Sequence, residues 1–207
     1  MKTLLCDLVT DIRMLFRVPV SAFFTVVFPS LMLIIMMASY GNPDIGTGIR
    51  LSDKYVLIAS GMGLVPLSLI TFPSWICSSV ESSYLLRLKY LHVSLARVAT
   101  SNALAHMVIA LCGTAVTFAV GVLFYDTRIP GLPALIAYSL QLIVVTASLM
   151  LFGAALAFIV RQTAVVIAVG LVLMFVVYML CGVFGDFSAM PASLQAAGNL
   201  IPLKYLM

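Results

Sequence analysis

The amino-acid sequence predicts an all-α polytopic membrane bundle, with an interfacial amphipathic helix at the N-terminus and five to six transmembrane helices. Of the 207 residues, 63% are hydrophobic and only 9% are charged, whereas a soluble domain carries about a quarter charged residues. The apolar residues also form long uncharged runs, each able to cross a hydrocarbon core of about 30 Å. We therefore expect a single transmembrane domain over residues 1–207.

The first element is an amphipathic helix over residues 1–18. Its apolar residues recur at helical spacing, while Asp7, Asp11 and Arg17 fall on the opposite side. A helix of this kind lies along the membrane surface. The two aspartates also interrupt the apolar core that a cleaved secretory signal would need. Pro19 then ends this helix, and the first span follows.

Short polar segments separate the predicted spans. Residues 40–50 are rich in Gly, Pro, Asn and Asp and predict an exposed loop. The second span contains Pro66 and Pro73, which lack an N–H, so we expect neighbouring helices to satisfy the carbonyls that they leave free. The spans are predicted at residues 20–39, 55–80, 98–125, 134–160 and 162–185.

The C-terminal segment, residues 187–207, is half polar and contains two prolines. This pattern is unsuited to a straight sixth span. We expect a short surface or re-entrant helix there.

The basic residues predict the orientation of the chain, because short cytoplasmic loops carry an excess of Lys and Arg. With the N-terminus in the cytoplasm, seven bases lie inside and four outside. The inner set is Lys2, Arg13, Arg17, Arg87, Lys89, Arg97 and Arg161, and the outer set is Arg50, Lys54, Arg128 and Lys204. This places the charged segment 81–97 in the cytoplasm.

Two local patterns accompany this order of elements. Val80–Lys89 runs from an acid to a basic pair between the second and third spans. The C-terminal segment contains F-x-x-x-P, ending at Pro191, and N-x-x-P-x-x-Y, formed by Asn199, Pro202 and Tyr205. The chain thus resembles the permease subunit of ABC-2 type transporters, in which the C-terminal motifs belong to an external re-entrant region.

Two departures from the family pattern stand out. The segment after Lys89 lacks the proline that often follows the basic pair in the family. The sequence also ends where the family enters a sixth span, so we expect a sixth helix to be missing from it.

The resemblance implies an exporter of the bacterial cytoplasmic membrane that pairs with a second permease copy, identical or sibling, and with two ATPase subunits. The chain has no phosphate-binding loop, so ATP and Mg²⁺ would bind to the partner ATPase subunit. We expect no cofactor to bind to this chain. A short cytoplasmic coupling helix would fit a groove on the ATPase. Its expected residues are Glu81, Tyr84, Leu85, Arg87, Leu88 and Lys89. The alternative is a solvated loop whose bases only set topology.

Amphiphilic molecules are the expected cargo, either a drug, an antimicrobial peptide or a lipid-like molecule. A secondary transporter is the first alternative, and it would use His106, which lies within the third span and could face the substrate path. A structural histidine bonded to a neighbouring helix is the more common case. A non-transporting membrane adaptor or immunity protein is the second alternative.

Other functions find little support. The eleven Lys and Arg are scattered, which disfavours nucleic-acid binding. His92 and His106 lie in neither an HExxH nor a nucleophile-elbow context, so we do not expect an enzyme. The Met, Cys and His residues give no convergent metal-ligand set. The small-residue run Gly153–Ala157 could serve either a dimer contact or packing within the chain.

Overall fold

The computed structural model describes residues 2–17, 23–44, 50–128, 130–183, 187 and 190–206. Its elements are α1 (Lys2–Arg17), η1 (Phe23–Val27), α3 (Phe28–Tyr40), α4 (Leu51–Pro66), η2 (Leu67–Thr71), α5 (Phe72–Glu81), α6 (Tyr84–Tyr90), α7 (Leu95–Tyr125), α8 (Leu132–Val160), α9 (Thr163–Leu180), α10 (Ala192–Asn199) and η4 (Pro202–Tyr205). The predicted all-α membrane bundle is confirmed. In the described part of the chain, five helical stretches are long and apolar enough to span a membrane.

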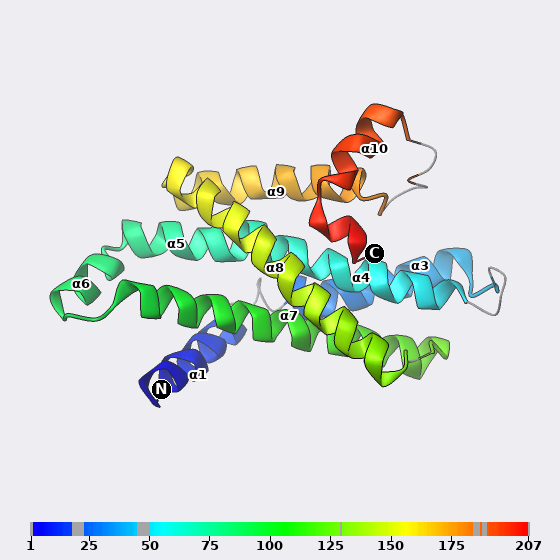
Figure 1. Cartoon of the computed structure of the whole chain (residues 1–207), viewed down its shortest axis with the longest axis horizontal. Helices are drawn as coiled ribbons and strands as arrows, with labels where there is room; N and C mark the ends of the chain where they lie inside the picture. Colours follow the sequence, from blue (N-terminus) through cyan, green and yellow to red (C-terminus); the bar gives the residue numbers. More distant parts are fainter. Residues whose placement is uncertain are drawn as a thin grey trace.

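Most of the spanning helices run roughly along the long axis of the molecule, and α8 crosses them diagonally (Figure 1). One end carries α6 and the turn between α8 and α9, and we call it the α6 end. The opposite end carries the α3–α4 and α7–α8 connections, and we call it the loop end. Helix α1 lies obliquely across α7 near the α6 end, as an interfacial helix would.

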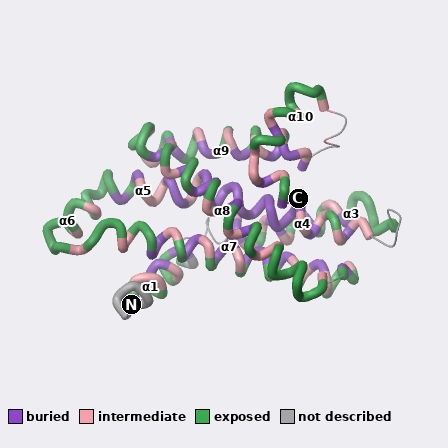
Figure 2. The backbone as a smooth tube through the Cα atoms, viewed as in Figure 1, coloured by how far each residue is buried: buried purple, intermediate pink, exposed green. Residues whose placement is uncertain are grey.

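The second span, formed by α4, η2 and α5, is the core of the bundle. In its most apolar stretch 78% of the residues are buried, against 22–33% in the other four spans. The buried residues lie mainly at the centre of the molecule (Figure 2). Helices α3 and α7 pack against α4, while α8 and α9 pack against α5. The other spans therefore leave most of their apolar surface for lipid.

The two largest differences from the predicted span ends are at the start of α4 and the end of α9. Helix α4 starts at Leu51 rather than residue 55, because the Asp53 side chain accepts the N–H of Arg50 at 3.0 Å and starts the helix within a charged segment. Helix α9 ends at Leu180 rather than residue 185. Gly182 has φ of 74° and its N–H donates to the carbonyl of Met179, a left-handed helix end that suits glycine. Pro19, residues 20–22 and residues 184–186 lie outside the described residues.

The carbonyl that Pro66 leaves free in the second span has a partner on another helix. Pro66 cannot donate to the carbonyl of Met62, four residues before it. Tyr178 of α9 donates its hydroxyl to that carbonyl at 2.6 Å, and its side chain is fully buried. The expectation that neighbouring helices satisfy freed carbonyls is met here.

Replacing Tyr178 by phenylalanine should therefore destabilise the fold. The variant leaves the carbonyl of Met62 buried without its donor, so we expect a loss of about 1 kcal/mol in the free energy of unfolding. Reversible unfolding in mixed detergent micelles measures it. Tyr90→Phe, at an exposed position, is the control and should leave stability unchanged. Equal stability of the two variants would contradict the role given to this hydrogen bond.

Glycines lie where carbonyls of the irregular second span face other helices. Phe72 donates its N–H to the carbonyl of Leu67, and Pro73 has no N–H, so the ladder is interrupted at Ser68. A Cβ on Gly153 of α8 would lie 2.3 Å from the carbonyl oxygen of Ser68. The small-residue run of α8 therefore packs within the chain. The sequence alone could not decide between this packing and a dimer contact.

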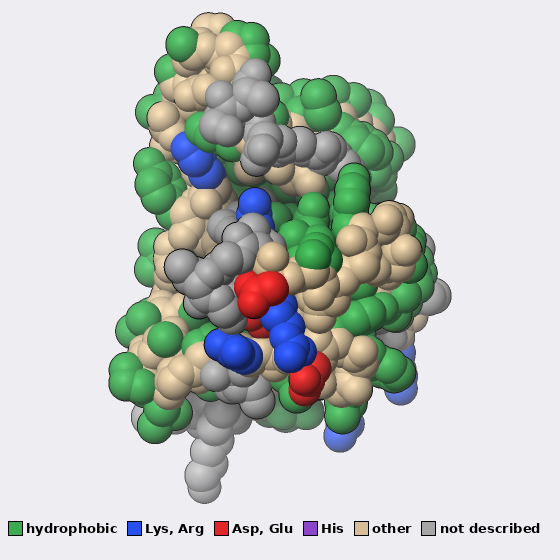
Figure 3. Space-filling model, turned by 90° about the vertical axis from the view of Figure 1, so that its right-hand side faces the viewer, with side chains coloured by type: hydrophobic (Ala, Val, Ile, Leu, Met, Phe, Trp, Pro, Cys, Tyr) green, Lys and Arg blue, Asp and Glu red, His purple; other side chains and the backbone are tan. Residues whose placement is uncertain are grey.

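Charged side chains gather at the loop end (Figure 3). Arg50 pairs with Asp126 at 2.9 Å. Asp53 accepts the backbone N–H of Arg128 at 2.9 Å, and the Asn42 side chain donates to the carbonyl of Tyr125 at 3.0 Å. These bonds tie the α3–α4 connection to the α7–α8 connection.

Candidate functional site

Helix α6 lies between two sharp turns at the α6 end. Ser83 before it and His92 after it both have φ of 56°, in the left-handed region. The N–H of Val93 donates to the carbonyl of Leu88, and the N–H of His92 donates to that of Lys89. These two bonds form a Schellman end with a histidine where glycine is usual. The chain thus leaves α5, forms one short helix beyond the bundle, and returns in α7 (Figure 1).

Three large apolar side chains on α6 and directly after it are more than half exposed, and we call them the outward face of α6. Leu86 is 53% exposed, Tyr90 is 76% exposed and Leu91 is 72% exposed. Leu85 and Leu88, the apolar residues that the sequence suggested for partner contact, are only half-exposed. Because an exposed apolar patch on a polar end commonly marks a protein interface, Leu86, Tyr90 and Leu91 are the stronger candidates.

The sequence could not find this outward face, because a helix of only seven residues has no periodicity that fixes its rotation about its axis. The available signal was the spacing of four between Leu86 and Tyr90, which places both on one side of a helix. Tyr84, Arg87 and Lys89 are also exposed, so the predicted charges do accompany the patch.

Within the residues that the structure describes, Glu81, unlike the other predicted coupling residues, forms hydrogen bonds with another helix of the bundle. It ends α5, and its carboxylate accepts the backbone N–H of Thr163 at 2.8 Å and the Thr163 hydroxyl at 2.6 Å. Thr163 is the first residue of α9, whose first N–H groups lack partners within the helix. Glu81 therefore links the base of α6 to the start of α9.

Helix α1 is held on α7 by polar contacts as well as apolar ones. Asp7 pairs with Arg97 at 3.1 Å. Asp11 is buried and accepts a hydrogen bond from the hydroxyl of Ser101 at 2.6 Å. The sequence predicted that both acids would lie on the polar face of an interfacial helix. The structure corrects this for Asp11, because α7 covers that part of the face.

His106 is fully buried in α7. Its Nδ1 lies 2.9 Å from the carbonyl oxygen of Asn102, one turn earlier, so Nδ1 carries the proton and donates. The ring meets the edge of Phe72 with a centroid distance of 5.3 Å. This is a packed position between α7 and α5, and His106 lines neither of the two large cavities.

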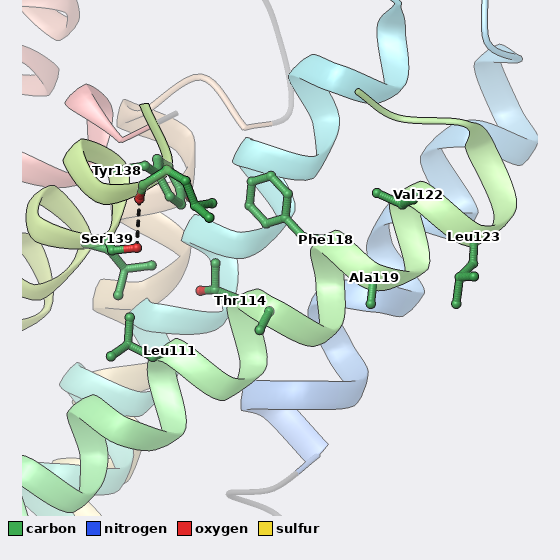
Figure 4. Close-up of a pocket in the computed structure, with 11 residues that line it drawn as sticks. Leu111, Thr114, Phe118, Ala119, Val122, Leu123, Tyr138 and Ser139 are labelled. Atoms are coloured by element: carbon green, nitrogen blue, oxygen red, sulfur yellow. Dashed lines mark hydrogen bonds between the residues drawn. The ribbon is translucent and has the colours of Figure 1, made fainter. Parts of the chain in front are cut away.

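A groove of about 650 Å³ opens between α7 and α8, toward the loop end (Figure 4). Apolar side chains, among them Leu111, Phe118 and Leu123, form most of its wall. Three hydroxyl-bearing residues, Thr114, Tyr138 and Ser139, also line it. Such a surface suits a molecule that is mainly apolar and carries a few hydrogen-bonding groups.

The predicted re-entrant residues come together at the loop end. Pro191 precedes α10, and Pro202 opens η4. The hydroxyl of Tyr205 donates to the carbonyl of Asn199 at 3.0 Å, and the Lys204 ammonium donates to the Asn199 side chain. The Gln141 amide of α8 donates to the carbonyl of Tyr205. These contacts fold the segment back against the spanning helices; its part in function stays a prediction.

Comparison with known proteins gives one match. The profile of a protein family described as "ABC-2 type transporter" matches residues 8–207. No curated protein and no solved structure matches the chain.

Proposed function

The chain belongs to the ABC-2 type transporter family, and from that premise we propose that it is the permease subunit of an exporter driven by ATP hydrolysis on a separate subunit. Two permease chains, identical or sibling, and two ATPase subunits with their ATP and Mg²⁺ would form the complete transporter. The cargo would be an amphiphilic drug, peptide or lipid-like molecule. The observation that carries the proposal is the exposed apolar face of α6, at one end of a membrane bundle.

The proposed mechanism transmits force through α6. Its face, Leu86, Tyr90 and Leu91, would pack into a groove on the ATPase, while Arg87 and Lys89 fix the register. A push on α6 would reach α5 through one short turn and α9 through the bonds between Glu81 and Thr163. ATP closure would then favour one of two arrangements of the permease pair, as a rigid-body switch.

The distribution of basic residues supports an α6 end in the cytoplasm of a bacterial cell, with the N-terminus on the same side. Arg13, Arg17, Arg87, Lys89 and Arg161 all lie near that end, whereas the bases at the loop end share their surface with Asp44, Asp53 and Asp126. The positive-inside rule then makes the loop end external. The groove between α7 and α8 supports an amphiphilic cargo, because it opens where lipid would lie.

The test is purification from native membranes followed by reconstitution. We expect a P-loop ATPase to elute with the chain, and cargo movement in proteoliposomes to require ATP. Transport that continues without an ATPase and stops when the proton gradient collapses would favour a secondary transporter instead. The absence of both an ATPase and transport would favour an adaptor.

A further inference from the structure

A second cavity, of about 490 Å³, lies near the α6 end. Its lining residues come from α1, η2, α5, α6, α7 and the start of α9. The groove between α7 and α8 is lined by apolar and hydroxyl-bearing residues, whereas the lining of this cavity also includes an acid and an amide, Asp11 and Asn102. It is therefore a different kind of site, although one of its lining residues, Thr163, is also the partner of Glu81 in the proposed path of force.

The cavity holds an acid without a cation. Asp11 is 8% exposed, and its carboxylate accepts a hydrogen bond from Ser101. In the described residues, the ion pairs of the structure join Arg97 to Asp7 and Arg50 to Asp126, and neither includes Asp11. Burial raises the pKa of Asp11, partly offset by its hydrogen bonds. A buried carboxylate in this state is strongly stabilised by a cation that enters beside it.

The neighbouring amide adds an acceptor. Asn102 is 1% exposed and lines the cavity, and its Oδ1 has no hydrogen-bond partner within the described part of the chain. A buried amide oxygen without a donor is costly to the fold. No described residue donates to this oxygen of Asn102, and none forms an ion pair with the Asp11 carboxylate beside it. A protonated amine offers three N–H groups and a positive charge.

The rest of the lining suits an apolar body. Trp75 and Tyr84 supply aromatic rings, and Met14 and Leu15 supply aliphatic surface. The Trp75 ring is stacked on Phe72 with a centroid distance of 6.2 Å, which holds it in place. Aromatic faces attract organic cations. Among the described residues that line the cavity there is neither Lys nor Arg, so these residues offer a phosphate group no cation.

We propose that this cavity binds a protonated amine carried on an apolar body, with the ammonium group at Asp11 and Asn102 and the body against Trp75 and Leu15. That such an amine is the cargo, taken from the inner leaflet, rests on the proposed function. The binding itself does not, because the cavity is built by this chain alone. A binding measurement without ATP therefore tests the site separately from the transport proposal.

Trp75 is the only tryptophan of the chain, so its fluorescence reports on this cavity directly. The experiment titrates dodecylammonium, below its micelle concentration, into the protein purified in phosphatidylcholine nanodiscs. The Trp75→Phe variant supplies the background from any accompanying subunit. Dodecanol and dodecyl phosphate, with the same chain length, are the uncharged and anionic controls. We expect a saturable change with dodecylammonium only.

Variants connect the signal to the site. Asp11→Asn should weaken dodecylammonium binding by about ten- to a hundredfold, the loss expected for a hydrogen bond to a charged group. Asp126→Asn makes the same change of charge at the loop end and should bind as the unaltered protein does. Ser78→Leu narrows the cavity without changing charge and should also weaken binding. If Asp11→Asn fails to fold, the binding measured for Ser78→Leu alone tests the proposed site.

Two outcomes would overturn the proposal. The first is an equal response to dodecanol, which would show that the ammonium group is not recognised. The second is full-strength binding by either folded variant, Asp11→Asn or Ser78→Leu, which would show that binding does not take place in this cavity as proposed. Competition by nanodiscs of phosphatidylethanolamine, whose headgroup is also a primary ammonium, would support recognition of the ammonium group and identify a lipid as its source.

Discussion

Replacing Leu86 with aspartate should abolish ATP-driven transport while the chain still inserts in the membrane. Leu86 lies on the outward face of α6 and is not part of the bundle's buried core. A charge at the centre of an apolar interface removes its packing and leaves an unpaired carboxylate against the partner. Because central interface residues contribute about 2 kcal/mol or more, we expect at least about a thirtyfold loss of affinity for the ATPase subunit.

The matched control is Leu200→Asp, which makes the same change at a leucine that is 86% exposed at the loop end. Co-purification of the ATPase and ATP-dependent transport are measured for both variants, with membrane insertion checked by fractionation. We expect Leu200→Asp to keep both activities. If Leu86→Asp keeps them too, then α6 is a solvated connection whose bases only set topology, and the proposed path of force is wrong.

Leu85 separates the sequence-based hypothesis from the structure-based one. The sequence suggested that Leu85 and Leu88 contact the ATPase, yet both are half-buried. Periodicity determines the spacing of residues on one face, but the rotation of a seven-residue helix depends on the turns at Ser83 and His92. Ser83 and His92 both have positive φ, which is uncommon for residues other than glycine, so the residue types gave no signal for these turns.

The spans themselves were predictable, because hydrophobic length is a property of one segment and requires no knowledge of its neighbours. The sequence predicted that a neighbouring helix would donate to the carbonyl freed by Pro66, but it could not predict which residue does so. A missing N–H demands a donor on another helix, and only the packing of α9 against α4 shows that Tyr178 supplies it.

The burial of Asp11 was outside the reach of the sequence for the same reason. An acid on the polar side of an amphipathic helix predicts exposure to water. Here α7 brings Ser101 and Asn102 against that side, so the polar side becomes an internal surface. The cavity beside Asp11 was therefore missed, and an acid followed by small polar residues in a later helix is too common a pattern to have revealed it.

Gly153→Val should destabilise the chain by about 3 kcal/mol, the upper part of the range for overpacking. A Cβ at this position would lie 2.3 Å from the carbonyl oxygen of Ser68 and 3.4 Å from the ring of Pro73. Neither the Ser68 carbonyl nor the Pro73 ring can move away easily, because the first is backbone and the second is a closed ring within the most buried span. The helices α8 and α5 would have to separate.

The measurement is reversible unfolding of the chain in detergent, at dilutions where permease copies are apart. Ala155→Val, two residues along α8 at an exposed position, adds methyl groups on the opposite side and should leave stability unchanged. A dimer contact at Gly153 predicts the reverse pattern, with a stable monomer that no longer pairs. Loss of stability in the separated chain therefore distinguishes packing within the bundle from packing between two bundles, because only the first persists when no second copy is present.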